Sequence, residues 1–220
     1  MIRFKICCIQ NIEEARLAVS LGACAVGLVS EMPSGPGPIS EDRIAEIVPH
    51  VPPGVATFLL TSKQDADSII RQQRRTRANT LQIVDAVSVE TYERLRSELP
   101  GISLVQVIHV RGDESVAEAR SVAPYVDGIL LDSGNPNLAV KVLGGTGRVH
   151  DWSLSRRIVE TCGKPTFLAG GLNAENVHEA VESVRPHALD VCSGVRTNGL
   201  LDEEKLQKFV AAIAVANLPR

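Results

Sequence analysis

Asp132 and Cys7 are the two side chains of this sequence best placed to transfer protons. Asp132 follows the apolar run Gly128-Ile129-Leu130-Leu131, so we expect its carboxyl group to be half-buried. Burial disfavours the carboxylate and raises the pKa of an aspartic acid, which suits a general acid. Cys7 follows Lys5-Ile6, and a thiol can act as a general base where nearby positive charge stabilises the thiolate. Without further context, Asp132 is more simply a strand-end cap and Cys7 a small core residue.

Two glycine-containing segments have the composition of an anion site. Gly170-Gly171 and Ser193-Gly194 each follow an apolar run. Glycine lets backbone N–H groups approach an anion closely, and a helix that begins after Leu172-Asn173 would add its positive dipole end. We therefore expect Gly170, Gly171, Ser193 and Gly194 to bind a phosphate group. Ordinary tight turns are the alternative.

Other reactive residues give weaker patterns. The five cysteines are odd in number, and no pair has the spacing of zinc ligands or of a redox motif, so we expect no metal and a reducing compartment. Gly144-Gly145-Thr146-Gly147-Arg148 does not fit the phosphate loop of NTPases. A mobile lid and a flexible surface loop are both compatible with that segment.

The elements that must position these residues alternate along the whole chain. Short β-branched apolar runs, each followed by a segment with helical spacing, predict eight strands: Phe4–Ile9, Ala25–Ser30, Ala56–Thr61, Leu81–Val84, Ser103–Val110, Gly128–Ser133, Thr166–Gly171 and Leu189–Gly194. The helices predicted between and after them are Ile12–Leu21, Ser40–Val48, Lys63–Arg74, Val87–Leu99, Glu114–Ala123, Ser153–Cys162, Ala174–Val184 and Glu203–Ala216.

This alternation favours a single-domain (β/α)8 TIM barrel over residues 1–220. The strand runs are continuously apolar, as in parallel strands covered on both faces. A doubly wound open sheet is the alternative, although no Gly-rich turn follows the first strand. In a barrel, active-site residues lie at the carboxyl ends of the strands, and the loops after strands seven and eight often bind phosphate. All the candidate residues lie at such ends: Cys7, Cys8, His109, Arg111, Asp132 and the four phosphate-site residues.

Composition argues against other classes of partner. The net charge is −3 and aromatic residues make up only 3% of the chain, which favours neither a nucleic acid nor an anionic membrane as partner. No run is long enough to span a membrane, and we recognise no signal peptide at the start. We therefore expect a cytoplasmic enzyme, either a monomer or a homodimer, with a small phosphorylated substrate.

An ordered set of segments resembles the phosphoribosylanthranilate isomerase family. The set comprises Lys5-Ile6-Cys7, Leu130-Leu131-Asp132-Ser133, Gly144–Gly147 before Asp151-Trp152, Leu168–Val177 and Asp190–Val195. The resemblance implies an Amadori rearrangement in tryptophan biosynthesis without a metal or organic cofactor. It also implies that Asp132 is the acid that opens the ribose ring and that Cys7 is the base that takes the proton from C2. Because side chains alternate along a strand, we expect Cys8 to turn away from the site.

The sequence departs from the family pattern in the part that meets the aromatic acid. The family has Gly where this chain has Cys8, and it has an arginine in the loop after strand two, where residues 30–40 contain no Lys or Arg. It also ends strand four with His-Gly, where this chain has Val84-Asp85. If the substrate carries an anthranilate carboxylate, Arg111 and Arg148 are the candidates to bind it. A paralogous isomerase of another phosphorylated aminosugar and a non-catalytic phosphometabolite binder are the alternatives.

Overall fold

Eight parallel strands form a closed barrel in the part of the chain that the structure describes. The computed structural model describes residues 2–134 and 150–216. The strands pair in chain order, and β1 closes the ring against β8. They are β1 (Arg3–Ile6), β2 (Ala25–Val29), β3 (Ala56–Thr61), β4 (Thr80–Ile83), β5 (Ser103–His109), β6 (Gly128–Asp132), β7 (Thr166–Leu168) and β8 (Ala188–Val191). The predicted (β/α)8 barrel is confirmed, and the open sheet is excluded.

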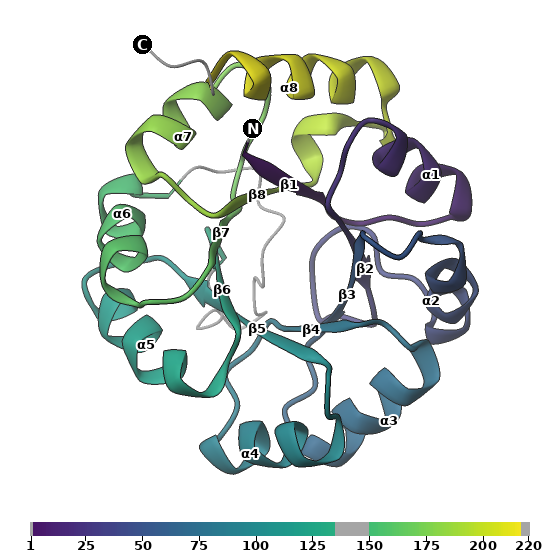
Figure 1. The fold of residues 1–220 in the computed structure, drawn as a ribbon, viewed down its shortest axis with the longest axis vertical. Helices are drawn as coiled ribbons and strands as arrows, with labels where there is room; N and C mark the ends of the chain where they lie inside the picture. Colours follow the sequence, from purple (N-terminus) through teal and green to yellow (C-terminus); the bar gives the residue numbers. More distant parts are fainter. Residues whose placement is uncertain (1, 135–149, 217–220) are drawn as a thin grey trace.

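Helices surround the strands as an outer ring (Figure 1). They are α1 (Ile12–Ser20), α2 (Glu41–Ile47), α3 (Ala66–Thr76), α4 (Val89–Glu98), α5 (Glu114–Val122), α6 (Trp152–Thr161), α7 (Val177–Val184) and α8 (Glu203–Ala216). Side-chain caps fix the first turns of several helices: Ser40 Oγ accepts from Arg43 N–H, and Asp202 Oδ1 accepts from Lys205 N–H. Short 3₁₀ turns η1 (Val48–His50), η2 (Ala123–Tyr125) and η3 (Ser193–Val195) complete the connections, with a small hairpin of β9 (Arg196–Thr197) and β10 (Leu200–Leu201).

Two layers of apolar side chains hold the barrel together. One lies between the strands and the helices and includes Ile6, Leu28, Leu59, Leu81 and Phe209, all fully buried. The other fills the barrel interior with Phe58, Leu60, Val105, Val107 and Leu130. No described helix is long and apolar enough to cross a membrane.

Three strands are shorter than predicted, and this difference matters for the site. β1 ends at Ile6, β7 at Leu168 and β8 at Val191, each three residues before its predicted end. Beyond β1 and β7 the backbone enters the left-handed region at Cys8 (φ 62°), Gly170 (φ 85°) and Gly171 (φ 66°), which ends strand pairing. Helix α7 begins at Val177 rather than Ala174, because Asn173 Oδ1 accepts from the N–H groups of Glu175 and Asn176 and forms a turn first.

Candidate active site

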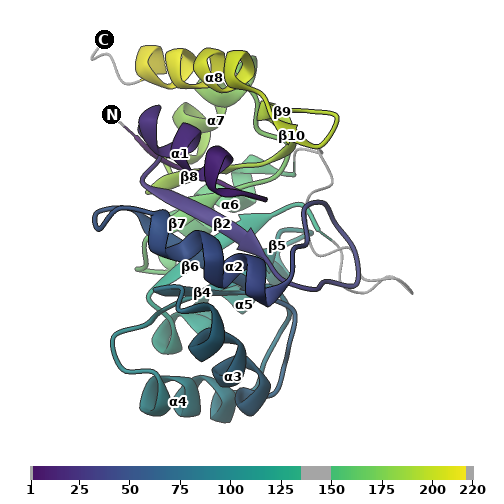
Figure 2. The same cartoon turned by 90° about the vertical axis from the view of Figure 1, so that its right-hand side faces the viewer.

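A cavity opens at the carboxyl ends of the strands. In Figure 2 the loop between β2 and α2 and the β9–β10 hairpin extend beyond the strands at the same end of the barrel. Residues from the ends of all eight strands or the loops after them line the cavity, whose empty volume is about 720 Å³. This volume includes solvent space at the open mouth of the cavity.

Most residues predicted for the site meet in this cavity. Cys7, Asp132, Gly170, Gly171 and Ser193 all line it. Gly194 and Arg111 do not, and Arg148 lies outside the described residues. His109, at the end of β5, is also absent from the lining. Its Nε2 lies 3.1 Å from Val84 O, so this ring has a structural role.

Asp132 occupies a buried position at the end of β6. Its side chain is buried, and Oδ1 accepts from the Ser133 N–H at 2.7 Å. Burial raises the pKa of Asp132 to about 6, and the nearby charge of Asp190 acts in the same direction, while the Ser133 hydrogen bonds and Lys5 oppose the rise. A carboxyl group with this pKa keeps a proton for a useful fraction of the time near neutral pH, as a general acid requires.

A buried ion pair includes Asp190, which lines the cavity, and was missed by the sequence reasoning. Lys5 Nζ donates to Asp190 Oδ1 at 2.9 Å, and both side chains are buried. Burial opposes the charge of the ammonium group, but Asp190, together with Cys7 and Cys8, more than compensates and raises the pKa of Lys5. The two residues are register partners on neighbouring strands, since Lys5 pairs with Asp190 across β1 and β8. The sequence could have revealed this pair, because Lys5 and Asp190 each interrupt an apolar run, on the first and the last strand of a closed barrel.

Cys7 lies beside this ion pair. A Cβ atom at Gly27 would lie 3.0 Å from Cys7 Sγ and 3.0 Å from Lys5 Nζ, so a residue without a side chain on β2 makes room for both. A hydrogen bond from the Cys8 thiol lowers the pKa of Cys7, burial raises it, and the positive charge of Lys5 lowers it, with a net decrease. The surroundings therefore favour the thiolate, which is the form needed in a base.

Cys8 also faces the cavity, so the prediction from strand alternation is wrong for this residue. Both Cys7 and Cys8 lie beyond the end of β1, and both line the cavity. The left-handed backbone of Cys8 breaks the alternation. Cys8 Sγ lies 2.7 Å from Cys192 Sγ. The sequence prediction assumed a strand through Ile9, and without that strand the alternation argument does not apply.

The glycine segments after β7 and β8 lie against each other. Gly170 and Gly171 both have positive φ, and Asn176 Nδ2 donates to Gly171 O at 2.9 Å, which fixes the turn. A Cβ atom at Gly194 would lie 2.0 Å from Leu172 O. Gly194 is therefore needed for the contact between the two loops, whereas Gly170, Gly171 and Ser193 form the cavity surface.

The lining contains no cation among the residues that the structure describes. Arg111 has an exposed side chain, and its backbone N–H donates to Ser115 Oγ at 3.1 Å. The described residues also contain no group of three or more His, Cys, Asp or Glu side chains placed to hold a metal ion.

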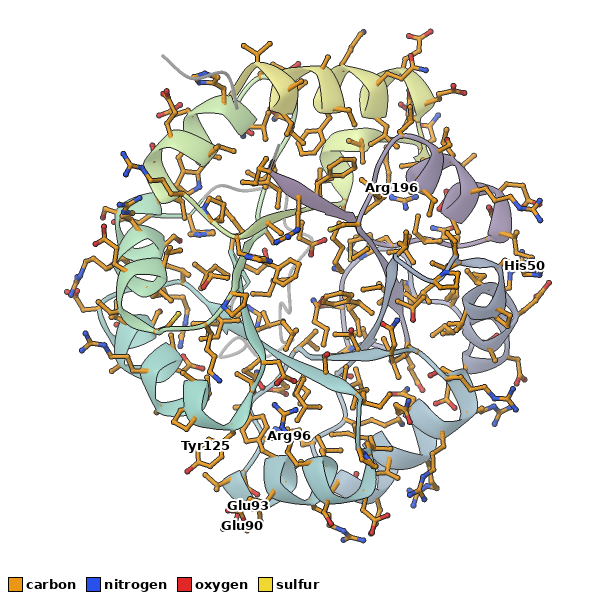
Figure 3. All side chains as sticks on the ribbon, in the orientation of Figure 1. His50, Glu90, Glu93, Arg96, Tyr125 and Arg196 are labelled. Atoms are coloured by element: carbon orange, nitrogen blue, oxygen red, sulfur yellow. The ribbon has the colours of Figure 1, made fainter. Side chains whose placement is uncertain are left out.

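Arg196 holds the backbone on which the two cysteines lie. It is buried, and its Nη2 donates to Cys7 O at 3.0 Å and to Cys8 O at 2.6 Å. Its guanidinium also pairs with Glu14 of α1, at 3.1 Å from Nη1 to Oε1, and Figure 3 shows Arg196 beside that helix. The sequence analysis did not single out Arg196.

Comparisons with known proteins agree with this geometry. The family model described as N-(5'phosphoribosyl)anthranilate (PRA) isomerase matches residues 4–212. N-(5'-phosphoribosyl)anthranilate isomerase 2 of Methanosarcina mazei is 35% identical over 95% of this chain and 92% of its own length. A crystal structure of phosphoribosyl anthranilate isomerase in complex with reduced 1-(o-carboxyphenylamino)-1-deoxyribulose 5-phosphate has a TM-score of 0.81 and 27% identity, and the match covers 98% of this chain and 100% of that one.

The family also includes dimeric members. A structure of monomers generated from the dimeric isomerase of Thermotoga maritima has a TM-score of 0.78 and 27% identity, over 98% of this chain and 100% of that one. A family match over nearly the whole chain, a curated relative above 30% identity and the same closed barrel agree with one another. The chain therefore belongs to the N-(5'-phosphoribosyl)anthranilate isomerase family, the intramolecular oxidoreductases of tryptophan biosynthesis.

Proposed function

We propose that this protein converts N-(5'-phosphoribosyl)anthranilate into 1-(o-carboxyphenylamino)-1-deoxyribulose 5-phosphate, with Asp132 as general acid and Cys7 as general base. The observation that carries the proposal is that two buried groups in one cavity have pKa values shifted in opposite directions. The pKa of Asp132 is raised to about 6, and that of Cys7 is lowered. One group is thereby suited to give a proton and the other to take one.

The reaction then needs only proton transfers. The Asp132 carboxyl group protonates the ring oxygen of the ribose, the bond from C1 to that oxygen breaks, and the nitrogen lone pair forms a protonated Schiff base. The Cys7 thiolate removes the proton from C2, and the electron pair neutralises the nitrogen to give an enol amine. Protonation at C1 and loss of the O2 proton give the ketone and return Asp132 and Cys7 to their starting states. Oxidation at C2 balances reduction at C1, so no external oxidant or reductant takes part.

The Lys5–Asp190 pair, whose Asp190 lines the cavity, supports both roles. The Lys5 ammonium favours the Cys7 thiolate, while the charge of Asp190 disfavours ionisation of Asp132. Of these two charges, Lys5 has the larger effect on the pKa of Cys7 and Asp190 has the larger effect on the pKa of Asp132. Lys5 and Asp190 act here as positioning residues, since neither needs to exchange a proton.

We propose that the substrate phosphate binds between Gly170-Gly171 and Ser193-Gly194. The positive φ of both Gly170 and Gly171 lets consecutive N–H groups turn toward one anion. Ser193 adds a hydroxyl group from the neighbouring loop, at the start of η3. The contact of Gly194 with Leu172 O sets the distance between the two loops.

Arg111 and Arg148 remain the proposed partners of the anthranilate carboxylate. A carboxylate that leaves water for a cavity needs a compensating cation or hydrogen bonds, and the described lining residues supply no Lys or Arg. Arg111 follows β5 at the carboxyl end of the barrel and has an exposed side chain that would have to turn inward. This lack of a cation in the described lining keeps one alternative open, an isomerase of another phosphorylated aminosugar.

Complementation of a tryptophan auxotroph that lacks this isomerase tests the proposal. Wild-type protein should restore growth, Cys7→Ala and Asp132→Asn should not, and Cys24→Ser is the matched control. Cys24 lies at the opposite end of the barrel, beside Arg3 and His187. Failure of the folded wild type to restore growth, or to convert phosphoribosylanthranilate in vitro, would reject this substrate in favour of the other aminosugar.

A further inference from the structure

Two thiols that the proposed reaction does not consume meet at the mouth of the cavity. Cys8 Sγ and Cys192 Sγ are 2.7 Å apart, although the residues are 184 positions apart in sequence. They follow neighbouring strands, β1 and β8. A disulfide bond is about 2.05 Å long, so the two sulfur atoms need to approach by only about 0.6 Å.

Cys8 occupies a backbone position that favours glycine. Its φ of 62° lies in the left-handed region, which costs a residue with a side chain free energy that glycine does not lose. A thiol in a strained backbone conformation at the edge of an active site is the kind of outlier that points to function.

The surroundings of Cys8 hold its thiol against Cys192. Cys8 Sγ also lies 3.5 Å from Pro36 O, and its Cβ lies only 2.6 Å from the place where a Cβ of Gly37 would be. On the other side, Arg196 Nη2 donates to Cys8 O at 2.6 Å. The backbone of Cys8 is therefore fixed from two directions, and the short distance to Cys192 does not depend on a free loop end.

We propose that Cys8 and Cys192 are an oxidation site, a pair of thiols that hydrogen peroxide converts reversibly into a disulfide. Cys192 is more exposed than the buried Cys8, so its sulfur attacks the peroxide first. The O–O bond breaks, water leaves, and Cys192 becomes a sulfenic acid. The Cys8 sulfur then attacks the Cys192 sulfur, the S–S bond forms, and the hydroxyl group leaves as a second water. Two thiols lose two electrons and two protons, and one peroxide becomes two waters.

The disulfide would act on turnover through Cys7, and this consequence rests on the proposed role of Cys7 as the base. In the reduced protein the Cys8 thiol donates a hydrogen bond that favours the Cys7 thiolate. A disulfide sulfur has no proton to donate. Loss of a hydrogen bond to a charged group should lower the thiolate fraction roughly tenfold near neutral pH, and kcat/KM should fall by about that factor.

Thiol mapping on the full chain tests the disulfide without reference to turnover. Reduced protein is treated with a small excess of hydrogen peroxide, alkylated with N-ethylmaleimide and digested with trypsin without reduction. Trypsin leaves Cys7 and Cys8 on residues 6–16, and Cys162 and Cys192 on residues 158–196. The mapping is therefore repeated with Cys162→Ser, and fragment-ion spectra separate Cys7 from Cys8.

We expect a linkage between Cys8 and Cys192, the loss of two of the five free thiols, and full recovery with dithiothreitol. Cys8→Gly, which suits the left-handed backbone, and Cys192→Ser should each prevent the linkage, while Cys24→Ser should not. Absence of any linkage, or a linkage through Cys7, would overturn the proposal. If the linkage forms but the ratio of oxidised to reduced kcat/KM stays at one, the predicted control of turnover through Cys7 is refuted.

Discussion

Replacing Asp132 with Asn should remove activity and stabilise the fold. Asn has nearly the same shape, and its Oδ1 can still accept from the Ser133 N–H that lies 2.7 Å from the carboxylate. It cannot deliver a proton, so turnover should fall by about 10²–10⁴-fold. The raised pKa of Asp132, about 6 instead of 3.8, means that the folded state disfavours the charged carboxylate. At about 1.36 kcal/mol per pKa unit, removing that charge should stabilise the fold by up to about 3 kcal/mol.

The sign of this effect depends on pH in a defined way. Between pH 3.8 and about 6, folded Asp132 binds more protons than the unfolded chain does, so the wild type loses stability as pH rises through that range. The difference in the free energy of unfolding between the Asn variant and wild type should therefore be near zero at pH 4 and reach its full value above pH 7. Urea unfolding at pH 4.5, 6 and 8 measures it, and 3 kcal/mol corresponds to a midpoint shift on the order of 1 M.

Asp127→Asn is the matched control for this experiment. Asp127 accepts hydrogen bonds from Arg96 Nη1 at 2.7 Å and from the Leu104 N–H at 2.8 Å, which lower its pKa although burial raises it. Its replacement should not stabilise the protein at pH 8. If Asp132→Asn retains near wild-type kcat, Asp132 is not the acid. If its stabilisation does not change with pH, burial does not raise the pKa of Asp132.

Four further substitutions test the remaining assignments. Cys7→Ser should lower kcat by about 10²-fold or more, because a hydroxyl group is a far weaker base near pH 7, and equal rates in steady-state assays would exclude Cys7 as the base. Gly171→Ala places a side chain at φ 66° in the proposed phosphate site and should raise KM more than it lowers kcat, whereas an unchanged KM would refute the site. Arg111→Met and Arg148→Met should each be compared with wild type. Loss of the arginine that binds the carboxylate should lower kcat/KM roughly ten- to a hundredfold. If neither substitution changes kcat/KM, neither arginine binds the carboxylate.

The sequence predicted the architecture because the barrel repeats one pattern eight times. Each apolar run and the helical segment after it could be found locally, and the carboxyl ends of the strands then follow from the fold. Asp132, Gly170 and Gly171 were found in this way, since each directly follows or ends an apolar run. Their location in the structure agrees with that reasoning.

Properties set by contacts between distant residues were not predictable from local patterns. The positive φ of Cys8 depends on Arg196 and Pro36, which hold its carbonyl and thiol from loops far away in sequence. The Lys5–Asp190 pair depends on the register between the first and last strands. Gly194 has the amino acid type of a phosphate-binding residue, but its contact with Leu172 O is visible only in three dimensions.

The ion pair between β1 and β8 links the folding of this chain to its final residues. Lys5 is completely buried, and its only salt-bridge partner among the described residues lies 185 positions later in sequence. During synthesis β1 leaves the ribosome long before β8, and a lysine cannot enter an apolar interior without a counter-charge at low cost. β1 should therefore dock stably only when β8 arrives, so closure of the barrel and assembly of the acid–base site are a single late event. A nascent chain that stops before β8 would keep its first strand in water.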